Sequence, residues 1–296
     1  MAIVTELSFP CRESGSLGSA TNEDGTLFAI INWVSHHVHI YTLDDKGACI
    51  GAPIMYGSAG SADEQLNDPQ LACFARRGGV DTLLICDSGN DRVVEVSADG
   101  RFLRHIAVEA GGSPYGVAYC GQRNAIAVSL QRAHVVVLLQ YESGAVLTTI
   151  GELWVRGASD GQLFGPIGLR FTADGARIVV ADYYNYRVSM FSADDGTFIA
   201  HVATRANGTR PLSHPHDVWS CKDDDSVLVA EDRRVVRIRT DGTVKVVLDD
   251  CAPSSISYSP GLHGIVVTTR KGRVLLIRDA WMSSLRCAWV TACVVV

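Results

Sequence analysis

The chain has 296 residues, of which 20% are charged, and a formal net charge of −6 at neutral pH. This acidic balance lacks the basic surface that nucleic-acid binding normally requires. The nine cysteines include no C-x-x-C pair, no secretory signal is visible, and the apolar end 288–296 is shorter than the roughly 20 residues that cross a bilayer. We therefore expect a cytoplasmic protein with reduced thiols that does not cross a membrane.

Short apolar segments separated by turn residues run along the whole chain. Asp-Gly occurs six times, between Val- and Ile-rich runs of about five residues, which is typical of antiparallel hairpins. Helical periodicity is absent almost everywhere. In chain order, six similar units cover 21–47, 57–108, 113–140, 151–203, 214–242 and 253–279. The pattern predicts an all-β fold.

The second and fourth units are the clearest copies of the repeat. Pro69 and Pro166 are 97 positions apart, and Asn90 and Asn185 are 95 apart, which leaves room for one weaker unit between them. The strands predicted for the fourth unit are Ile167–Phe171, Arg177–Ala181, Arg187–Phe191 and Thr197–Val202. Four antiparallel strands repeated every 50 residues or so indicate the blades of a propeller.

The sequence thus predicts one domain over residues 1–296, a six-bladed β-propeller of four-stranded antiparallel blades. The predicted blades cover approximately 10–56, 57–108, 109–150, 151–203, 204–248 and 249–296. Closing the ring leaves no open sheet edge. The closing strand could come from Ala2–Phe9, within residues 1–9, or from Cys287–Val296.

Two turns carry a more specific motif. They read Cys86-Asp87-Ser88-Gly89-Asn90-Asp91-Arg92-Val93 and Ala181-Asp182-Tyr183-Tyr184-Asn185-Tyr186-Arg187-Val188. Both resemble the NHL repeat, whose signature is a Pro and a small-residue strand followed by (V/A)-D-x-x-N-x-R-(I/V). The resemblance implies a six-bladed platform for protein or RNA partners, often attached to ubiquitin-ligase modules. No RING or B-box zinc pattern occurs in the chain, so a ligase role would be substrate recognition for activity supplied by another protein.

The Asp, Asn and Arg residues of these turns recur with the repeat, so we interpret them as structural. We expect the Asp and Asn side chains to hydrogen-bond their own turn and the Arg to stack on the adjacent blade.

Aromatic residues in two loops of the fourth unit are the main candidate binding residues. They are Trp154, Phe164, Tyr183, Tyr184 and Tyr186. Aromatic rings make good interface anchors, so the leading hypothesis is a non-catalytic platform that binds a protein or peptide at one rim and needs no cofactor. The alternative for these rings is packing onto neighbouring blades. Trp219 is expected in the core.

A metal-dependent propeller enzyme, a lyase or a lactonase, is the alternative from another functional class. Peptidyl-hydroxyglycine lyases bind zinc through three histidines from Pro-His motifs. His216 matches one such motif, but Tyr115 stands at the corresponding position of the third unit. His37 and His39 share one strand face, as a polar edge strand would also allow. A catalytic zinc needs three protein ligands, so these three histidines are metal candidates without a complete site.

Two further alternatives depend on charged residues. Six-bladed lactonases use a central calcium ion, but the Asp runs of this chain fall where hairpins turn, and we interpret them as solvated turns. A second alternative function is RNA binding through a patch formed by Arg233, Arg234, Arg237 and Arg239.

Overall fold

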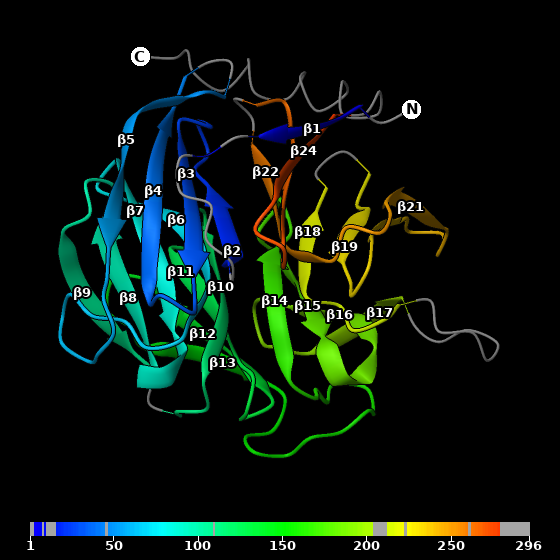
Figure 1. Ribbon diagram of the computed structural model, residues 1–296. Coiled ribbons are helices and arrows are strands. Elements are labelled where there is room, and N and C mark those ends of the chain that lie inside the picture. The colour runs from blue at the N-terminus through cyan, green and yellow to red at the C-terminus, as the bar shows by residue number, and fades with distance from the viewer. Residues whose placement is uncertain are drawn as a thin grey trace, which may run out of the picture.

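The computed structural model describes residues 3–7, 9, 16–44, 47–108, 110–203, 212–221, 224–259 and 262–278. These residues form six antiparallel sheets of four strands each (Figure 1). The predicted six-bladed propeller is confirmed. The helical segments among the described residues are two 3₁₀ turns, η1 (Ser88–Asn90) and η2 (Tyr183–Asn185), and neither could cross a membrane.

The strands follow the predicted blades closely. Blade 1 contains β2 (Ser16–Thr21), β3 (Leu27–Asn32), β4 (His37–Leu43) and β5 (Cys49–Tyr56). Blade 2 contains β6 (Pro69–Arg77), β7 (Val80–Asp87), β8 (Arg92–Ser97) and β9 (Phe102–Ala107). Blade 3 contains β10 (Pro114–Cys120), β11 (Ala125–Leu130), β12 (Val135–Gln140) and β13 (Val146–Ile150).

The remaining blades have the same order. Blade 4 contains β14 (Pro166–Phe171), β15 (Arg177–Asp182), β16 (Arg187–Ser192) and β17 (Phe198–Ala203). Blade 5 contains β18 (Asp217–Ser220), β19 (Val227–Ala230), β20 (Val235–Ile238) and β21 (Val244–Leu248). Blade 6 contains β22 (Pro253–Ser259), β23 (Gly264–Thr269), β24 (Val274–Arg278) and the N-terminal strand β1 (Ile3–Leu7).

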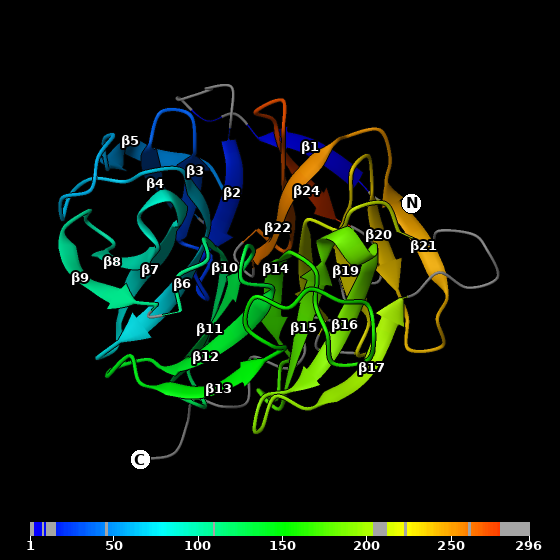
Figure 2. The ribbon, with the colours of Figure 1, turned by 90° about the horizontal axis from the view of Figure 1, so that it is seen from below.

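The first strand of each blade lies nearest the axis, and Figure 2 shows β2, β6, β10 and β14 near the centre with β5, β9, β13 and β17 at the outside. The ring therefore has two faces. We call the face where the first strands begin the start face, and the face where they end the end face. Middle strands such as β11 are buried along their whole length, because adjacent blades cover both sides of the sheet.

The N-terminal strand closes the ring. β1 pairs with β24 in antiparallel register, from Ile3 opposite Arg278 to Leu7 opposite Val274. This confirms the first of the two predicted closures, whereas Cys287–Val296 lies outside the described residues. Pairing with β1 covers the edge of β24, which would otherwise offer unpaired backbone groups to other chains.

The repeated Asp, Asn and Arg residues hold the loops that lead into blades 2 and 4. The buried Asp182 carboxylate accepts hydrogen bonds from Asn185 Nδ2 at 2.8 Å, Arg187 Nε at 2.7 Å and the Phe164 amide at 2.7 Å. Arg187 also donates to three carbonyls of the incoming loop, those of Ala158, Ser159 and Gln162. The structural interpretation is confirmed for Asp182 and Asn185. The arginine differs from the expectation, because it binds the loop before its own blade.

Glycines allow the first strands to approach one another around the axis. A Cβ on Gly116 would stand 2.4 Å from the carbonyl oxygen of Ile167 in the next blade. One on Gly168 would stand 2.7 Å from the carbonyl oxygen of His216. Asp217 fills the same level, where its buried carboxylate accepts from the Ile256 amide at 2.9 Å. We call this narrow level of the channel the waist.

We expect Phe9→Ala to lower the free energy of unfolding by about 3–5 kcal/mol, the usual cost of removing a buried aromatic ring. Phe9 follows β1, is 5% exposed, and packs against Phe28 and Tyr41 of blade 1 with ring centroids 4.9 Å and 4.8 Å away. Denaturant unfolding would measure the change. Val4→Thr is the matched control, since Val4 lies on the same closing strand but is 44% exposed. Equal effects of the two substitutions would contradict this account of closure.

Candidate functional site

Polar and aromatic side chains gather at the centre of the start face. Two histidines, His214 and His216, precede β18, and Asp232 lies in the loop between β19 and β20. Arg270 comes from the corresponding loop of blade 6, and Tyr183 from η2 of blade 4. His214 has a positive φ of 44°, and Pro215 follows it, so the backbone turns sharply before the strand. Three blades thereby contribute to one cluster, which we call the His216 site.

Asp232 is the anchor of the His216 site. Its Oδ1 lies 3.1 Å from His216 Nε2 and accepts from Arg270 at 3.0 Å. Its Oδ2 lies 2.8 Å from His214 Nδ1 and accepts from the Ser213 hydroxyl at 3.0 Å. The Arg270 guanidinium also contacts His216 Nε2 directly. One carboxylate therefore fixes both histidine rings and the guanidinium.

The environment shifts the pKa of both titrating groups. Burial, together with the positive charge of Arg270, lowers the pKa of His216 to about 4, although Asp232 acts in the opposite direction. Burial alone would raise the pKa of Asp232, but hydrogen bonds from His216, His214 and Arg270 outweigh it and hold this pKa well below its usual range. At neutral pH the site therefore contains a neutral imidazole between a carboxylate and a guanidinium.

The structure brings two of the five predicted aromatic residues, Tyr183 and Tyr186, to this site. The Tyr183 ring lies 5.2 Å from His216 and 4.7 Å from His214, and the Tyr186 ring lies 4.4 Å from His214. Tyr183 and Tyr186 are half-buried, so for these two the alternative of packing onto the neighbouring blade describes the structure better than free exposure.

The other predicted aromatic residues extend from the site toward the rim. Phe164 is half-buried and stacks with Tyr184, with centroids 4.8 Å apart. Tyr184 is 46% exposed and Trp154 is 58% exposed. The Trp154 amide donates to the Ala133 carbonyl at 2.9 Å, which holds its loop beside blade 3. Trp154 and Tyr184 are therefore the two most exposed members of the set.

A buried amide also lies at the start face. Gln70 is 5% exposed and donates from Nε2 to Asp68 Oδ1 at 2.8 Å. Its Oε1 has no hydrogen-bond partner within the described ranges. A buried carbonyl oxygen without a donor is costly, so a ligand with a donor group would be favoured there.

The donor set does not fit a zinc or calcium centre. His214, His216 and Asp232 are close together, but the Arg270 guanidinium supplies the positive charge beside them. In the part of the chain that the structure describes, no group of three His, Cys, Asp or Glu residues is arranged to hold a metal ion.

The other metal candidates, His37 and His39, also have no third ligand among the residues that the structure describes. The rings of His37 and His39 lie 4.6 Å apart, but both residues are buried in β4, the third strand of blade 1. The expectation of a polar edge-strand face was therefore wrong, because β5 occupies the edge and the pair faces the protein interior.

The four arginines proposed as an RNA patch do not form one surface. Arg233 is exposed and pairs with Asp250 at 2.9 Å. Arg237 is 7% exposed and pairs with Asp224 at 2.5 Å. Arg239 lies beyond the end of β20, on the opposite side of the blade from Arg233. The shared strand face expected for positions 237 and 239 is therefore not an open basic surface.

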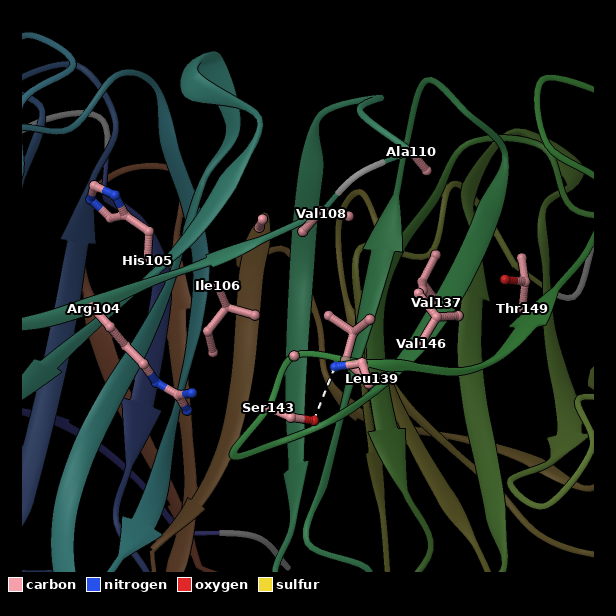
Figure 3. A pocket seen from close by; sticks show the side chains of 13 residues that line it. Arg104, His105, Ile106, Val108, Ala110, Val137, Leu139, Ser143, Val146 and Thr149 are labelled. Carbon is pink, nitrogen blue, oxygen red and sulfur yellow. Dashed lines mark hydrogen bonds between the residues drawn. The ribbon is translucent and has the colours of Figure 1, made fainter.

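A groove of about 360 Å³ lies at the outside of the ring between blades 2 and 3 (Figure 3). Its walls include the apolar side chains of Ile106, Val137 and Leu139. Arg104, His105, Ser143 and Thr149 are the polar residues in its lining, and the charged one, Arg104, already binds the Glu95 carboxylate at 2.6 Å and two carbonyls. This groove is far from the His216 site in the ring and carries no comparable polar cluster.

Sequence reasoning missed His214, Asp232 and Arg270. The sequence did contain an indication of Asp232. Glu231 occupies the structural position of Asp87 and Asp182, because its carboxylate accepts a hydrogen bond from the Ser213 amide of the incoming loop. The next residue, Asp232, is a second acid that the turn does not need, and its carboxylate contacts His214 and His216. Arg270 lies in a blade where the repeated turn motif is lost, so no sequence pattern indicated it.

No family model matches the chain, and no curated protein sequence matches it. Solved structures are similar in fold. A luciferin-regenerating enzyme has a TM-score of 0.71 at 10% identity, covering 95% of this chain and 96% of that chain. A gluconolactonase from Xanthomonas campestris has a TM-score of 0.68 at 15% identity, covering 90% and 86%.

Virginiamycin B lyase from Staphylococcus aureus is also similar. Its structure as a catalytically inactive histidine-to-alanine variant with quinupristin has a TM-score of 0.62 at 11% identity, covering 94% of this chain and all of that chain. At these identities the likeness shows the six-bladed propeller fold and leaves the NHL resemblance a prediction.

Proposed function

We propose that the chain is an enzyme that opens or cleaves a small ester or lactone by acid–base chemistry at the His216 site. The observation that carries this proposal is the neutral imidazole of His216, held between the Asp232 carboxylate and the Arg270 guanidinium beside the channel axis. A base that is neutral at pH 7 can take a proton, and fixed charges on both sides stabilise the products of that step.

The geometry gives each group a role. Nε2 of His216 can accept from Arg270 when the ring hydrogen is on Nδ1, and it can donate to Asp232 when it carries the hydrogen itself. Proton uptake makes both ring nitrogens donors. The contact to Asp232 then strengthens and the contact to Arg270 becomes repulsive. The guanidinium is released to bind an anionic oxygen on the substrate.

Lactone opening shows how the atoms balance. A water molecule adds its oxygen to the carbonyl carbon while its proton moves to His216, and the carbonyl oxygen becomes an oxyanion that Arg270 stabilises. The ring C–O bond then breaks, and the leaving oxygen takes the proton back from His216. Elimination from an ester would use the same two groups, with the proton taken from carbon in place of water.

Comparison with the similar structures supports an enzyme over a passive platform. All three are named as enzymes, one as a lactonase and one as a lyase, and the lyase variant that lacks a histidine is described as inactive. The described residues of this chain contain no donor set that would suit a metal-dependent lyase or lactonase. The proposed chemistry therefore uses protein side chains for both proton transfer and charge stabilisation.

His216→Asn should lower kcat/KM for hydrolysis or elimination by about 100-fold or more, the usual contribution of a general base. Proton release from a panel of γ-lactones, δ-lactones and aryl esters would measure turnover, both with and without EDTA. His263→Asn is the matched control, because His263 is an exposed histidine in a turn at the end face. Equal turnover by the His216 variant, loss of wild-type turnover with EDTA, or no turnover of any panel member would contradict the proposal.

The pKa of His216 should respond in opposite directions to its two neighbours. Arg270→Gln removes a positive charge and should raise this pKa from about 4, whereas Asp232→Asn removes a negative charge and should lower it. NMR titration of the ring protons would follow both changes. Above pH 5 the wild-type ring should be neutral, so the acid limb of kcat/KM should fall near pH 4. Shifts of the same sign in both variants would disprove the arrangement.

One observation favours a second function, the platform predicted from the sequence. Leu153, Trp154 and Val155 are consecutive in the loop after β13 and are 41%, 58% and 37% exposed. Together with Tyr184 they offer an apolar surface on the start face, where a protein or peptide partner of the NHL type would bind.

A photo-cross-linking residue placed at Trp154 should capture one discrete protein in an extract of the cells that make this chain. The same residue at Val80, which is 63% exposed in the first hairpin of blade 2 at the end face, is the control. Mass spectrometry would identify the adducts. Identical adducts from both positions, or none from Trp154, would contradict the platform function.

A further inference from the structure

The end of the channel opposite the His216 site contains a cavity of about 710 Å³. All six blades line it, through the last residues of their first strands and the hairpin turns that follow. Its volume lies within the range of pockets that hold drug-sized molecules. We call it the end-face cavity.

Five aromatic rings surround this cavity. They are Phe74, Tyr119, Phe171, Trp219 and Tyr258, one from each of blades 2 to 6. Four of them occupy the same register, the fifth residue after the Pro that opens their strand. The sequence suggested that Trp219 belongs to the core, but it is half-buried and faces the cavity, with its ring 6.2 Å from Tyr258. Aromatic walls favour a flat apolar ligand.

One cationic side chain lies among these rings. The Arg170 guanidinium stacks over the Trp219 ring at 5.2 Å from its centroid and donates to the Val117 carbonyl at 3.4 Å. Its Nε is buried and has no hydrogen-bond partner, and Arg170 has no ion-pair partner within the residues that the structure describes. A desolvated guanidinium without a carboxylate attracts an anion.

The nearest buried acid does not satisfy this guanidinium. Asp217 lies at the waist, and Arg170 acts to lower its pKa against the larger effect of burial, which raises it. Its two oxygens accept from the Ser255 hydroxyl at 3.0 Å and from the Ile256 and Val218 amides. The Asp217 carboxylate is therefore already hydrogen-bonded to groups of the waist.

A buried hydroxyl group in the cavity also has no hydrogen-bond partner among the described residues. Ser257 is 1% exposed and lines the cavity from β22. Its Oγ has no hydrogen-bond partner among the described residues. A buried hydroxyl normally has a partner, so Ser257 is a second, independent sign that a polar group of a ligand enters this cavity.

We propose that the end-face cavity binds a small aromatic carboxylate. Arg170 and Ser257 donate hydrogen bonds to the carboxylate, and the aromatic rings of the wall pack against the apolar body. The charges at the rim are consistent with this assignment. Arg76 is paired with Asp24 and Asp81, and the exposed Glu23 is solvated, so Arg170 is the cation left for the ligand.

This site is separate from the His216 site. The waist lies between them, where Gly116 and Gly168 bring the first strands into backbone contact. A ligand in the end-face cavity therefore does not depend on the proposed acid–base activity. The substitution His216→Asn should leave its binding unchanged.

Isothermal titration with 1-naphthoate would test the proposal, with methyl 1-naphthoate and 1-naphthylmethylammonium as the neutral and cationic probes of the same shape. Wild-type protein should bind the carboxylate more tightly than either of the other probes. Arg170→Met keeps most of the side-chain volume and removes the charge. It should weaken naphthoate binding by about tenfold to a hundredfold and leave the methyl ester unaffected.

Two further variants keep the test decisive. Ser257→Ala removes only a hydroxyl and should weaken naphthoate binding by about threefold to tenfold, which guards against a folding defect in the Arg170 variant. Arg76→Met is the matched control, because Arg76 lies at the rim and is already paired. Naphthoate that does not bind, that binds no better than the cationic probe, or that binds both cavity variants as tightly as wild type would overturn the proposal.

Discussion

The contact of the six first strands around the axis is the constraint on which both candidate sites depend. Gly116 and Gly168 have no side chains where a neighbouring backbone passes within 2.4–2.7 Å of the position of a Cβ. Asp217 completes this level, because its carboxylate accepts from the Ile256 amide and the Ser255 hydroxyl of blade 6, and the buried amide is thereby given a partner. The channel is thereby divided, and the residues on either side of the waist are held by rigid strand ends.

The two sites differ mainly in how the positive charge of their arginine is neutralised. Arg270 shares a carboxylate with two histidines, so its charge is compensated until a proton moves, which suits a reaction step. Arg170 lies among aromatic rings, its Nε has no hydrogen-bond partner among the described residues, and the carboxylate that it influences, Asp217, is already hydrogen-bonded at the waist, which suits ligand binding. The same side chain therefore has different chemistry at the two ends of one channel.

Much of the fold could be predicted from the sequence because the repeat has a physical basis. Asp182, Asn185 and Arg187 close one turn and hold one loop, and the same spacing recurs in blade 2, where it has the same function. The ring closure remained open between two ends, since strand pairing of β1 with β24 leaves no local pattern. Apolar content alone could not decide between the candidates.

The sites were harder to predict because their members are distant in the sequence. Asp232 and Arg270 reach His216 from loops 16 and 54 positions away, and only the ring geometry brings them together. The aromatic wall of the end-face cavity could have been predicted more easily from the sequence. Alignment of the units on Pro69, Pro114, Pro166 and Pro253 places Phe74, Tyr119, Phe171 and Tyr258 at one register position. Trp219 packs against the core of blades 5 and 6, as expected, but it also lines the channel, because a strand residue near the axis can face it.

Blade 6 is built from strands near both ends of the described chain, and this affects the order in which the molecule folds. Its outer strand, β1, is synthesised before the other described strands, whereas its partner β24 follows the strands of blades 1 to 5. Blades 1 to 5 can form their local hairpins during synthesis, but β1 has no partner until nearly the whole described chain has emerged. Such a pairing of distant segments is slow because the loop between them must close first. The nascent chain therefore exposes one unpaired strand and one open ring for most of its synthesis, the period in which a chaperone would protect it most.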